Sequence, residues 1–139
     1  MAFDFIPGER PFSPPKRRGG GASAKMAGML AEQAALRRYV KGGARLLDKN
    51  WRAPRLHGNG ELDLVLERDG VVIFVEVKQR RTLLEAGYSI TRAQLERMRM
   101  AALAWMDAHG RWGGAMQFDL VYCDRYGAME KVPNIWFDD

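Results

Sequence analysis

The chain contains few of the residues that build disulfides or soft-metal sites. Its 139 residues include one cysteine, Cys123, and two histidines, His57 and His109. A single cysteine excludes a disulfide within the chain and argues against a thiolate zinc site. Two histidines do not support a zinc nuclease of the histidine-rich kind. We therefore expect any metal site to use oxygen ligands.

Long apolar segments are also missing. No run of apolar residues approaches the roughly 20 positions that a membrane-spanning helix needs. Residues 1–10 have no long apolar core and do not resemble a signal peptide. We therefore expect a cytoplasmic protein with no membrane partner.

The charge balance is moderately basic. Lys and Arg number 22 against 17 Asp and Glu, which gives a formal net charge of +5. This excess favours an anionic partner, with nucleic acid ahead of a membrane surface. A length of 139 residues predicts a single domain that is large enough to bury a core.

Proline, glycine and a basic cluster set the first segment apart. Residues 1–22 contain four prolines and several glycines, and residues 16–18 are all basic. This composition predicts a disordered tail, whereas residues 23–139 are expected to form the folded domain. Two interpretations of the tail stay open: it adds non-specific contacts with phosphate, or it is a solvated leader with no fixed role.

Hydrophobic periodicity predicts an alternation of helices and strands. A helix is expected at residues 23–41, capped by Ser23, with an apolar stripe of Met26, Met29, Leu36 and Val40. Strands are expected at residues 44–51, 61–67, 71–79, 116–123 and 134–137, a second helix at 92–109, and a connection at 82–88. The core order of helix, three strands, helix and strand predicts an α/β fold, a mixed sheet flanked by helices.

Charged residues interrupt two of these apolar strands. Asp63 lies in the first, and Glu76 and Lys78 lie in the second, after a turn at Asp69-Gly70. Charges inside apolar strands are costly to bury unless they are paired or bound to a metal. A tight hairpin would set Asp63 opposite or diagonal to Glu76. Because side chains alternate between faces, Glu61 is expected on the face of Asp63, and Leu62, Leu64 and Leu66 on the other.

These residue types match the hydrolysis of a phosphodiester with a hard divalent cation. Asp63 and Glu76 would bind Mg²⁺ or Mn²⁺, with the carbonyl of Val77 as a third oxygen ligand. Lys78 would hold or polarise the attacking water, or neutralise charge on the phosphate. Glu61 would tune or extend the metal site, or pair with Arg52. The plainer interpretation of Glu76 and Lys78 is a solvated pair on an exposed strand.

Five segments together resemble a known superfamily. They are Ala31-Glu32-x-x-Ala35, Asn50-Trp51-Arg52, Gly60-Glu61-Leu62-Asp63-Leu64, Phe74-Val75-Glu76-Val77-Lys78-Gln79-Arg80, and Phe118-Asp119-Leu120-Val121. The combination resembles the PD-(D/E)xK phosphodiesterases, which have the restriction-endonuclease-like fold. More narrowly, it is similar to the YraN-like family of small bacterial proteins, over roughly residues 25 to 137.

The resemblance implies roles for particular residues. Asp63, Glu76 and Lys78 occupy the three positions of the motif, and Glu32 matches an acidic residue that many relatives carry on the first helix. Glu32 lies on the inward side of that helix, so its carboxylate would reach the metal directly or through water. Pairing with Arg52 or a nearby backbone group is the open alternative.

Three positions depart from the family pattern. Leu62 stands where the motif has its nominal proline. Gln94 and Gln117 stand where relatives often have a lysine and an arginine. The two glutamines remove possible phosphate contacts.

The expected function is a metal-dependent nuclease that hydrolyses phosphodiester bonds in DNA, with Arg52, Arg80 and Arg81 as phosphate contacts or else as solvated charges. The alternative is a non-catalytic nucleic-acid-binding module, or an interaction scaffold, that retains the nuclease fold. Nothing in the sequence demands a dimer.

Overall fold

The computed structural model describes residues 21–135. The helices are α1 (Gly21–Lys41), the 3₁₀ turn η1 (Arg55–His57), α2 (Leu83–Tyr88) and α3 (Arg92–Ala108). The strands are β1 (Arg45–Arg52), β2 (Glu61–Arg68), β3 (Val71–Gln79), β4 (Met116–Cys123) and β5 (Met129–Val132). The predicted tail lies outside the described residues except at 21–22, which begin α1. Ser23, expected as the cap, lies inside that helix. In the described part of the chain, no helix has the length and apolar character to cross a bilayer.

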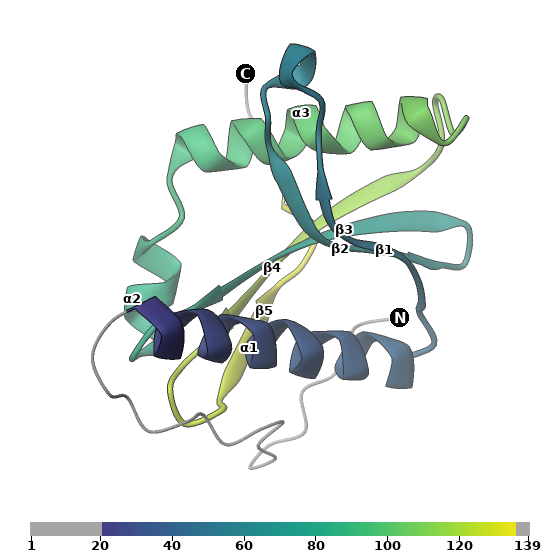
Figure 1. The fold of residues 1–139 in the computed structure, drawn as a ribbon. Coiled ribbons are helices and arrows are strands. Elements are labelled where there is room, and N and C mark those ends of the chain that lie inside the picture. The colour runs from purple at the N-terminus through teal and green to yellow at the C-terminus, as the bar shows by residue number, and fades with distance from the viewer. Residues whose placement is uncertain (1–20, 136–139) are drawn as a thin grey trace.

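The strands form one five-stranded mixed sheet in the order β1-β2-β3-β4-β5. Only β3 and β4 are parallel, and the segment that joins them contains α2 and α3. Figure 1 shows α1 on one face of the sheet and α3 on the opposite face. This arrangement confirms the predicted α/β class and is consistent with a restriction-endonuclease-like fold.

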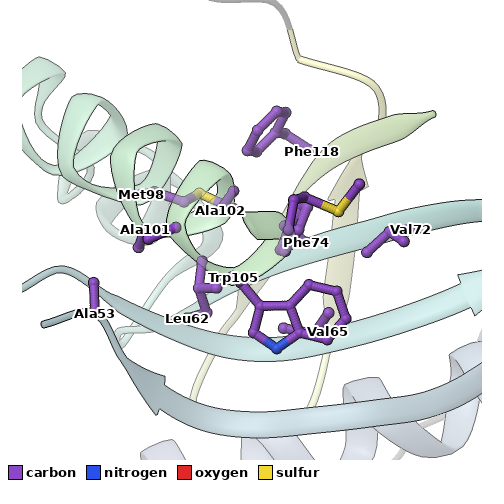
Figure 2. Close-up of a cluster of buried hydrophobic side chains, with 12 residues drawn as sticks. Ala53, Leu62, Val65, Val72, Phe74, Met98, Ala101, Ala102, Trp105 and Phe118 are labelled. Carbon is purple, nitrogen blue, oxygen red and sulfur yellow. The ribbon is translucent and has the colours of Figure 1, made fainter. Parts of the chain in front are cut away.

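The core under α3 is built from bulky side chains. A capping box begins the helix, because the Thr91 hydroxyl accepts from the Gln94 backbone amide and the Gln94 side chain accepts from the Thr91 backbone amide. Trp105 packs edge-on against Phe74, and Phe74 stacks on Phe118, with ring centroids 5.8 Å and 5.6 Å apart. Figure 2 shows this cluster between α3 and the sheet.

The core under α1 uses mainly small residues, which corrects the predicted stripe except at Leu36, a partly buried residue that packs against this core. Met26, Met29 and Val40 are about half exposed, at 49%, 50% and 51%. The buried face instead consists of Ala27, Ala31, Ala34, Ala35 and Tyr39. Small side chains let the helix approach the sheet closely, so the burial of the sheet's own aliphatic residues drives this contact.

A buried carboxylate ties α1 to the sheet. Asp119 on β4 is fully buried and accepts hydrogen bonds from the Tyr39 hydroxyl, the Gln117 side-chain amide and the Asn134 backbone amide. Burial and the charge of Asp119 raise the pKa of Tyr39 well above its usual range. This network satisfies a charge that would otherwise be costly to bury.

Two elements differ from the prediction. Residues 83–88 form helix α2, where a connection was expected, and the Thr82 hydroxyl caps it by accepting from the Glu85 amide. The last described strand is β5, at Met129–Val132, because the Asp124 carboxylate closes a turn that folds the chain back on β4. The strand predicted at 134–137 is wrong at 134–135, and residues 136–137 lie outside the described range.

Candidate active site

The site lies where β2 and β3 separate. Their antiparallel ladder pairs residues 64–68 with residues 71–75, and Asp69-Gly70 closes it with φ angles of 52° and 78°, as a tight hairpin turn requires. Beyond Leu64, β2 pairs only with β1, and their shared hairpin turns toward α3 (Figure 1). A gap therefore opens between β2 and the last residues of β3.

Close contact with α3 holds the hairpin in this position. A Cβ on Gly60 would lie 2.5 Å from the carbonyl oxygen of Arg97, so only glycine fits there. The bend also corrects the predicted alternation of β2. Leu62 packs in the α3 cluster, whereas Leu64 and Leu66 pack in the α1 cluster.

Asp63 fills the gap between the strands. Its Oδ2 accepts a hydrogen bond of 2.8 Å from the backbone amide of Val77. In an extended strand the N–H and C=O of one residue point to the same edge. The carbonyl of Val77 therefore faces the same gap as the Asp63 carboxylate.

Glu76 and Lys78 lie on the α3 side of β3, next to Asp63. The Lys78 Nζ is 3.3 Å from Glu76 Oε1, and the two side chains are only 15% and 19% exposed. Burial raises the pKa of Asp63 to about 8, and the charge of Glu76 adds to the increase. Burial also raises the pKa of Glu76, which Lys78 opposes. Two partly buried carboxylates thus compete for one proton.

An open pocket gives solvent access to these carboxylates. It has a volume of about 250 Å³, and its walls include Glu61, Asp63, Glu76, Gln94 and Arg97. Arg97 is not among the arginines that the sequence predicted as phosphate contacts. The only sequence signal for it was its position one helical turn after Gln94. It brings a cation to the wall of an acidic pocket.

Glu32 lies on α1, outside the acidic pocket. It lines a small cavity of about 50 Å³ together with Lys49 and Leu64. Burial raises its pKa to about 7, with further contributions from the charges of Asp63 and Glu61. Across residues 21–135, no three His, Cys, Asp or Glu side chains gather as a group able to hold a metal ion. The charge of Glu32 also contributes to the raised pKa of Glu76, although Glu32 does not line the acidic pocket.

The predicted arginines fall in two places. Arg52 pairs with Glu61 at 3.0 Å across β1 and β2, at the rim of the acidic pocket, so Glu61 both pairs with Arg52 and lines the pocket. Arg80 and Arg81 lie beyond, at the end of β3. Arg80 donates to the Gln79 carbonyl, and Arg81 pairs with Glu85 of α2. The structure does not bring these two to the pocket wall.

Both glutamines that depart from the family pattern have structural partners. Gln94 caps α3 while it lines the pocket. Gln117 donates to the buried Asp119 at 2.9 Å.

The oxygen donors at the gap fit a hard divalent cation. Asp63 and Glu76 adjoin with raised pKa values, and the Val77 carbonyl faces the same space. A cation with two carboxylates, one carbonyl and water is typical of Mg²⁺ sites. These three oxygen donors are the reason that the site suits such a cation.

A family model described as "Uncharacterised protein family UPF0102" matches residues 31–123. The chain belongs to this family. UPF0102, the YraN-like family, is part of the restriction-endonuclease-like superfamily. The matched residues include Asp63, Glu76 and Lys78, all of α3, and α1 from Ala31 onward.

Three UPF0102 relatives illustrate the match. A UPF0102 protein of Myxococcus xanthus is 36% identical over 121 residues, which cover 86% of this chain and 93% of the relative. One of Nitrobacter winogradskyi is 42% identical over 83 residues, covering 60% and 67%. One of Oleidesulfovibrio alaskensis is 36% identical over 109 residues, covering 76% of this chain and 52% of the relative, so the chain spans about half of that protein.

Proposed function

We propose that this UPF0102 protein is a metal-dependent nuclease that hydrolyses phosphodiester bonds in DNA. One observation carries the proposal: Asp63 and Glu76 adjoin in an open pocket, both with raised pKa values, and Lys78 lies 3.3 Å from Glu76. Crowding two carboxylates in this way costs stability. Such groups cluster at functional sites, where the cost serves chemistry.

The proposed roles follow from the donor types. Asp63, Glu76 and the Val77 carbonyl would hold Mg²⁺ or Mn²⁺. When bound, the cation supplies Lewis acidity and positive charge against the phosphate. The Lys78 ammonium has three N–H donors, and its contact with Glu76 Oε1 leaves others that orient the attacking water or donate to a phosphate oxygen.

The remaining charges help to bind the substrate. Arg97 in the pocket wall and Arg52 at the rim present guanidinium groups, which engage phosphate oxygens in pairs. Glu61 restrains Arg52 at 3.0 Å. Glu32 assists from α1, since its charge deepens the negative potential that attracts a cation.

Cleavage assays test this proposal directly. The full chain is incubated with duplex, single-stranded and branched DNA in Mg²⁺, Mn²⁺ or EDTA. We expect cleavage only with a divalent cation, and a loss of about a hundred-fold or more in Asp63→Asn, Glu76→Gln and Lys78→Met. Glu96→Gln is the matched control, because Glu96 is an exposed acid paired with Arg99 on α3. Cleavage that survives Asp63→Asn would refute the assignment.

Titration calorimetry with Mn²⁺ provides a readout independent of turnover. We expect binding to the unaltered chain and to Glu96→Gln, and none to Asp63→Asn. The alternative, a non-catalytic nucleic-acid-binding module, predicts salt-sensitive DNA binding without a metal requirement. An interaction scaffold would bind neither the metal nor DNA.

A further inference from the structure

A second depression lies beside α2, on the face of the sheet that also carries the acidic pocket. It is an open groove of about 530 Å³, within the range typical of ligand sites. Its walls are Leu83, Leu84, Gly87, Tyr88, Tyr122 and Glu130, which we call the α2 groove. Leu84 and Tyr88 are 69% and 81% exposed, although both are large and apolar over most of their surface.

Strand register joins the α2 groove to the acidic pocket. Lys78 on β3 is the register partner of Tyr122 on β4, and Tyr122 is the partner of Glu130 on β5. Register partners present their side chains to the same face of a sheet. Lys78 therefore stands between Glu76, its ion-pair partner in the acidic pocket, and the groove wall at Tyr122.

The groove has the chemistry of a nucleobase site. Tyr88 offers an exposed aromatic ring, the ring of Tyr122 lies against Gly87 in the groove wall, and the two leucines add apolar surface. Glu130 supplies a carboxylate that accepts hydrogen bonds but repels phosphate, so a bare anion does not fit. The exocyclic amino group of cytosine, adenine or guanine is a matching donor.

Cations lie outside the groove, where the strand's phosphates would run. A hydrogen bond from the Arg125 amide to the Arg81 carbonyl, at 3.4 Å, brings the β4–β5 turn beside the start of α2. Both arginines are exposed. Arg81 pairs with Glu85, and Arg125 donates to the Tyr126 hydroxyl, so positive charge is present at this end of the groove. Positive charge beside an aromatic surface is a common arrangement for binding single strands.

We infer that the α2 groove receives an unpaired base of the DNA strand that is cut at the acidic pocket. The inference rests on the proposed function and sharpens its substrate. DNA with a single-stranded or frayed segment beside the scissile bond is bound through Tyr88 stacking, and a fully paired blunt duplex lacks this contact.

The test measures binding in EDTA, where no cleavage occurs. The probes are a fluorescein-labelled single strand of about ten nucleotides, the same strand carrying 2-aminopurine, and the blunt duplex. We expect Tyr88→Ala to weaken single-strand binding about five-fold or more and to remove the quenching of 2-aminopurine. Duplex binding should change little. Tyr88→Phe keeps the aromatic ring and should restore both signals.

Trp112→Ala is the matched control. Trp112 is 82% exposed, close to Tyr88, but it follows the C-terminus of α3, whereas α2 precedes the N-terminus of that helix, roughly 25 Å away. This variant should bind as the unaltered chain does. A single strand of thymine, which lacks the amino group, should bind more weakly than one of cytosine, and Glu130→Gln should reduce that difference.

Specific results would overturn the inference. These are unchanged single-strand binding and quenching in Tyr88→Ala, an equal loss in Trp112→Ala, or a shift in the solution mass of Tyr88→Ala, which would make the groove a contact between copies. The nuclease proposal fails separately. Quenching that depends on Tyr88 without any cleavage leaves the groove standing, whereas metal-dependent cleavage with no effect of Tyr88→Ala refutes only the groove.

Discussion

The two halves of the β2–β3 pair show how one hairpin divides stability from chemistry. In the closed half, residues 64–68 and 71–75 exchange a regular ladder, and both faces are covered by helices. In the open half, beyond Leu64, the strands part, and a side chain bonds the backbone where a neighbouring strand would. The sequence runs through both halves without a break. Glu67 in the closed half pairs with Arg45 and Arg111, whereas the open half sets Asp63 and Glu76 beside each other.

The difference has an energetic meaning. A ladder inside a sheet leaves no backbone group free for a side chain or a ligand, because the neighbouring strand already satisfies each N–H and C=O. Where the ladder opens, backbone N–H and C=O groups lose their strand partner, and Asp63 accepts a hydrogen bond from the backbone amide of Val77. The open half therefore offers oxygen donors to a ligand at a cost in stability that the closed half offsets.

The largest expected effect lies in the closed half. Phe74→Ala removes a fully buried ring that contacts Trp105 and Phe118. We expect a loss of about 3–5 kcal/mol in the free energy of unfolding, measured with denaturant. Leu56→Ala, at a position 94% exposed on η1, should stay within about 0.5 kcal/mol. Equal losses at both sites would contradict the picture of a closed, stabilising half.

The next effect concerns the contact that keeps the open half open. Gly60→Ala would place a methyl group 2.5 Å from a backbone oxygen of α3, so we expect about 1–3 kcal/mol of destabilisation. We also expect the displaced hairpin to distort the acidic pocket and therefore to weaken Mn²⁺ binding. Gly28→Ala is the control, because nothing lies within 4 Å of its Cβ, and it should stabilise α1 by about 0.5–1 kcal/mol. A neutral Gly60→Ala would mean that the hairpin does not depend on close packing.

A pH effect of smaller size tests the electrostatics of the open half without metal. The folded-state pKa values of Asp63 and Glu32, about 8 and about 7, lie above their usual values of 3.8 and 4.5. Folding therefore takes up protons at these two carboxylates. Their protonation stabilises the folded state fully below about pH 4, and this stabilisation is lost as the pH rises through their folded-state pKa values. In EDTA the free energy of unfolding should fall between about pH 5 and about pH 8.

Asp63→Asn should flatten this fall and raise stability at the alkaline end, because it removes one of the competing charges. Saturating Mn²⁺ should flatten the fall in the unaltered chain. A profile that is equally steep in Asp63→Asn would show that other groups cause it.

The smallest effect belongs to the rim. Arg52 and Glu61 form an ion pair whose side chains are 64% and 40% exposed, so Arg52→Ala should change the free energy of unfolding by less than about 1 kcal/mol. Its effect on DNA binding should be larger and should reduce the salt dependence. A substantial loss of stability in Arg52→Ala would mean that Arg52 stabilises the fold, as the closed half does, and would contradict its assignment to the rim.

Local signals predicted much of this structure. Asp69-Gly70 marked the hairpin, and Thr91 with Gln94 marked the start of α3, because turn and capping chemistry involve neighbours in the chain. The same chemistry contained a signal that was missed. Thr82 and Glu85 have the capping spacing that begins α2, and they were interpreted as part of a connection.

Errors arose where packing between distant segments decides. The methionines of α1 are more apolar than its alanines, yet the alanines are buried, because small side chains let the helix pack closely on the large aliphatic residues of the sheet. In the same way, strict alternation would place Leu62 on the α1 side with Leu64 and Leu66. It lies on the α3 side instead, because the β1–β2 hairpin turns to pack on α3.

By itself, the sequence determined the fold class, the family and which two strands bear the acidic residues. It also determined that both carboxylates would stand in otherwise apolar surroundings, since strand composition is readable along the chain. Only the tertiary structure decided where β2 and β3 separate. It also decided that Arg97 lines the acidic pocket and that Glu32 lies outside it on α1. Those outcomes depend on distances across the sheet and between layers, which arise from the packing of segments far apart in the chain.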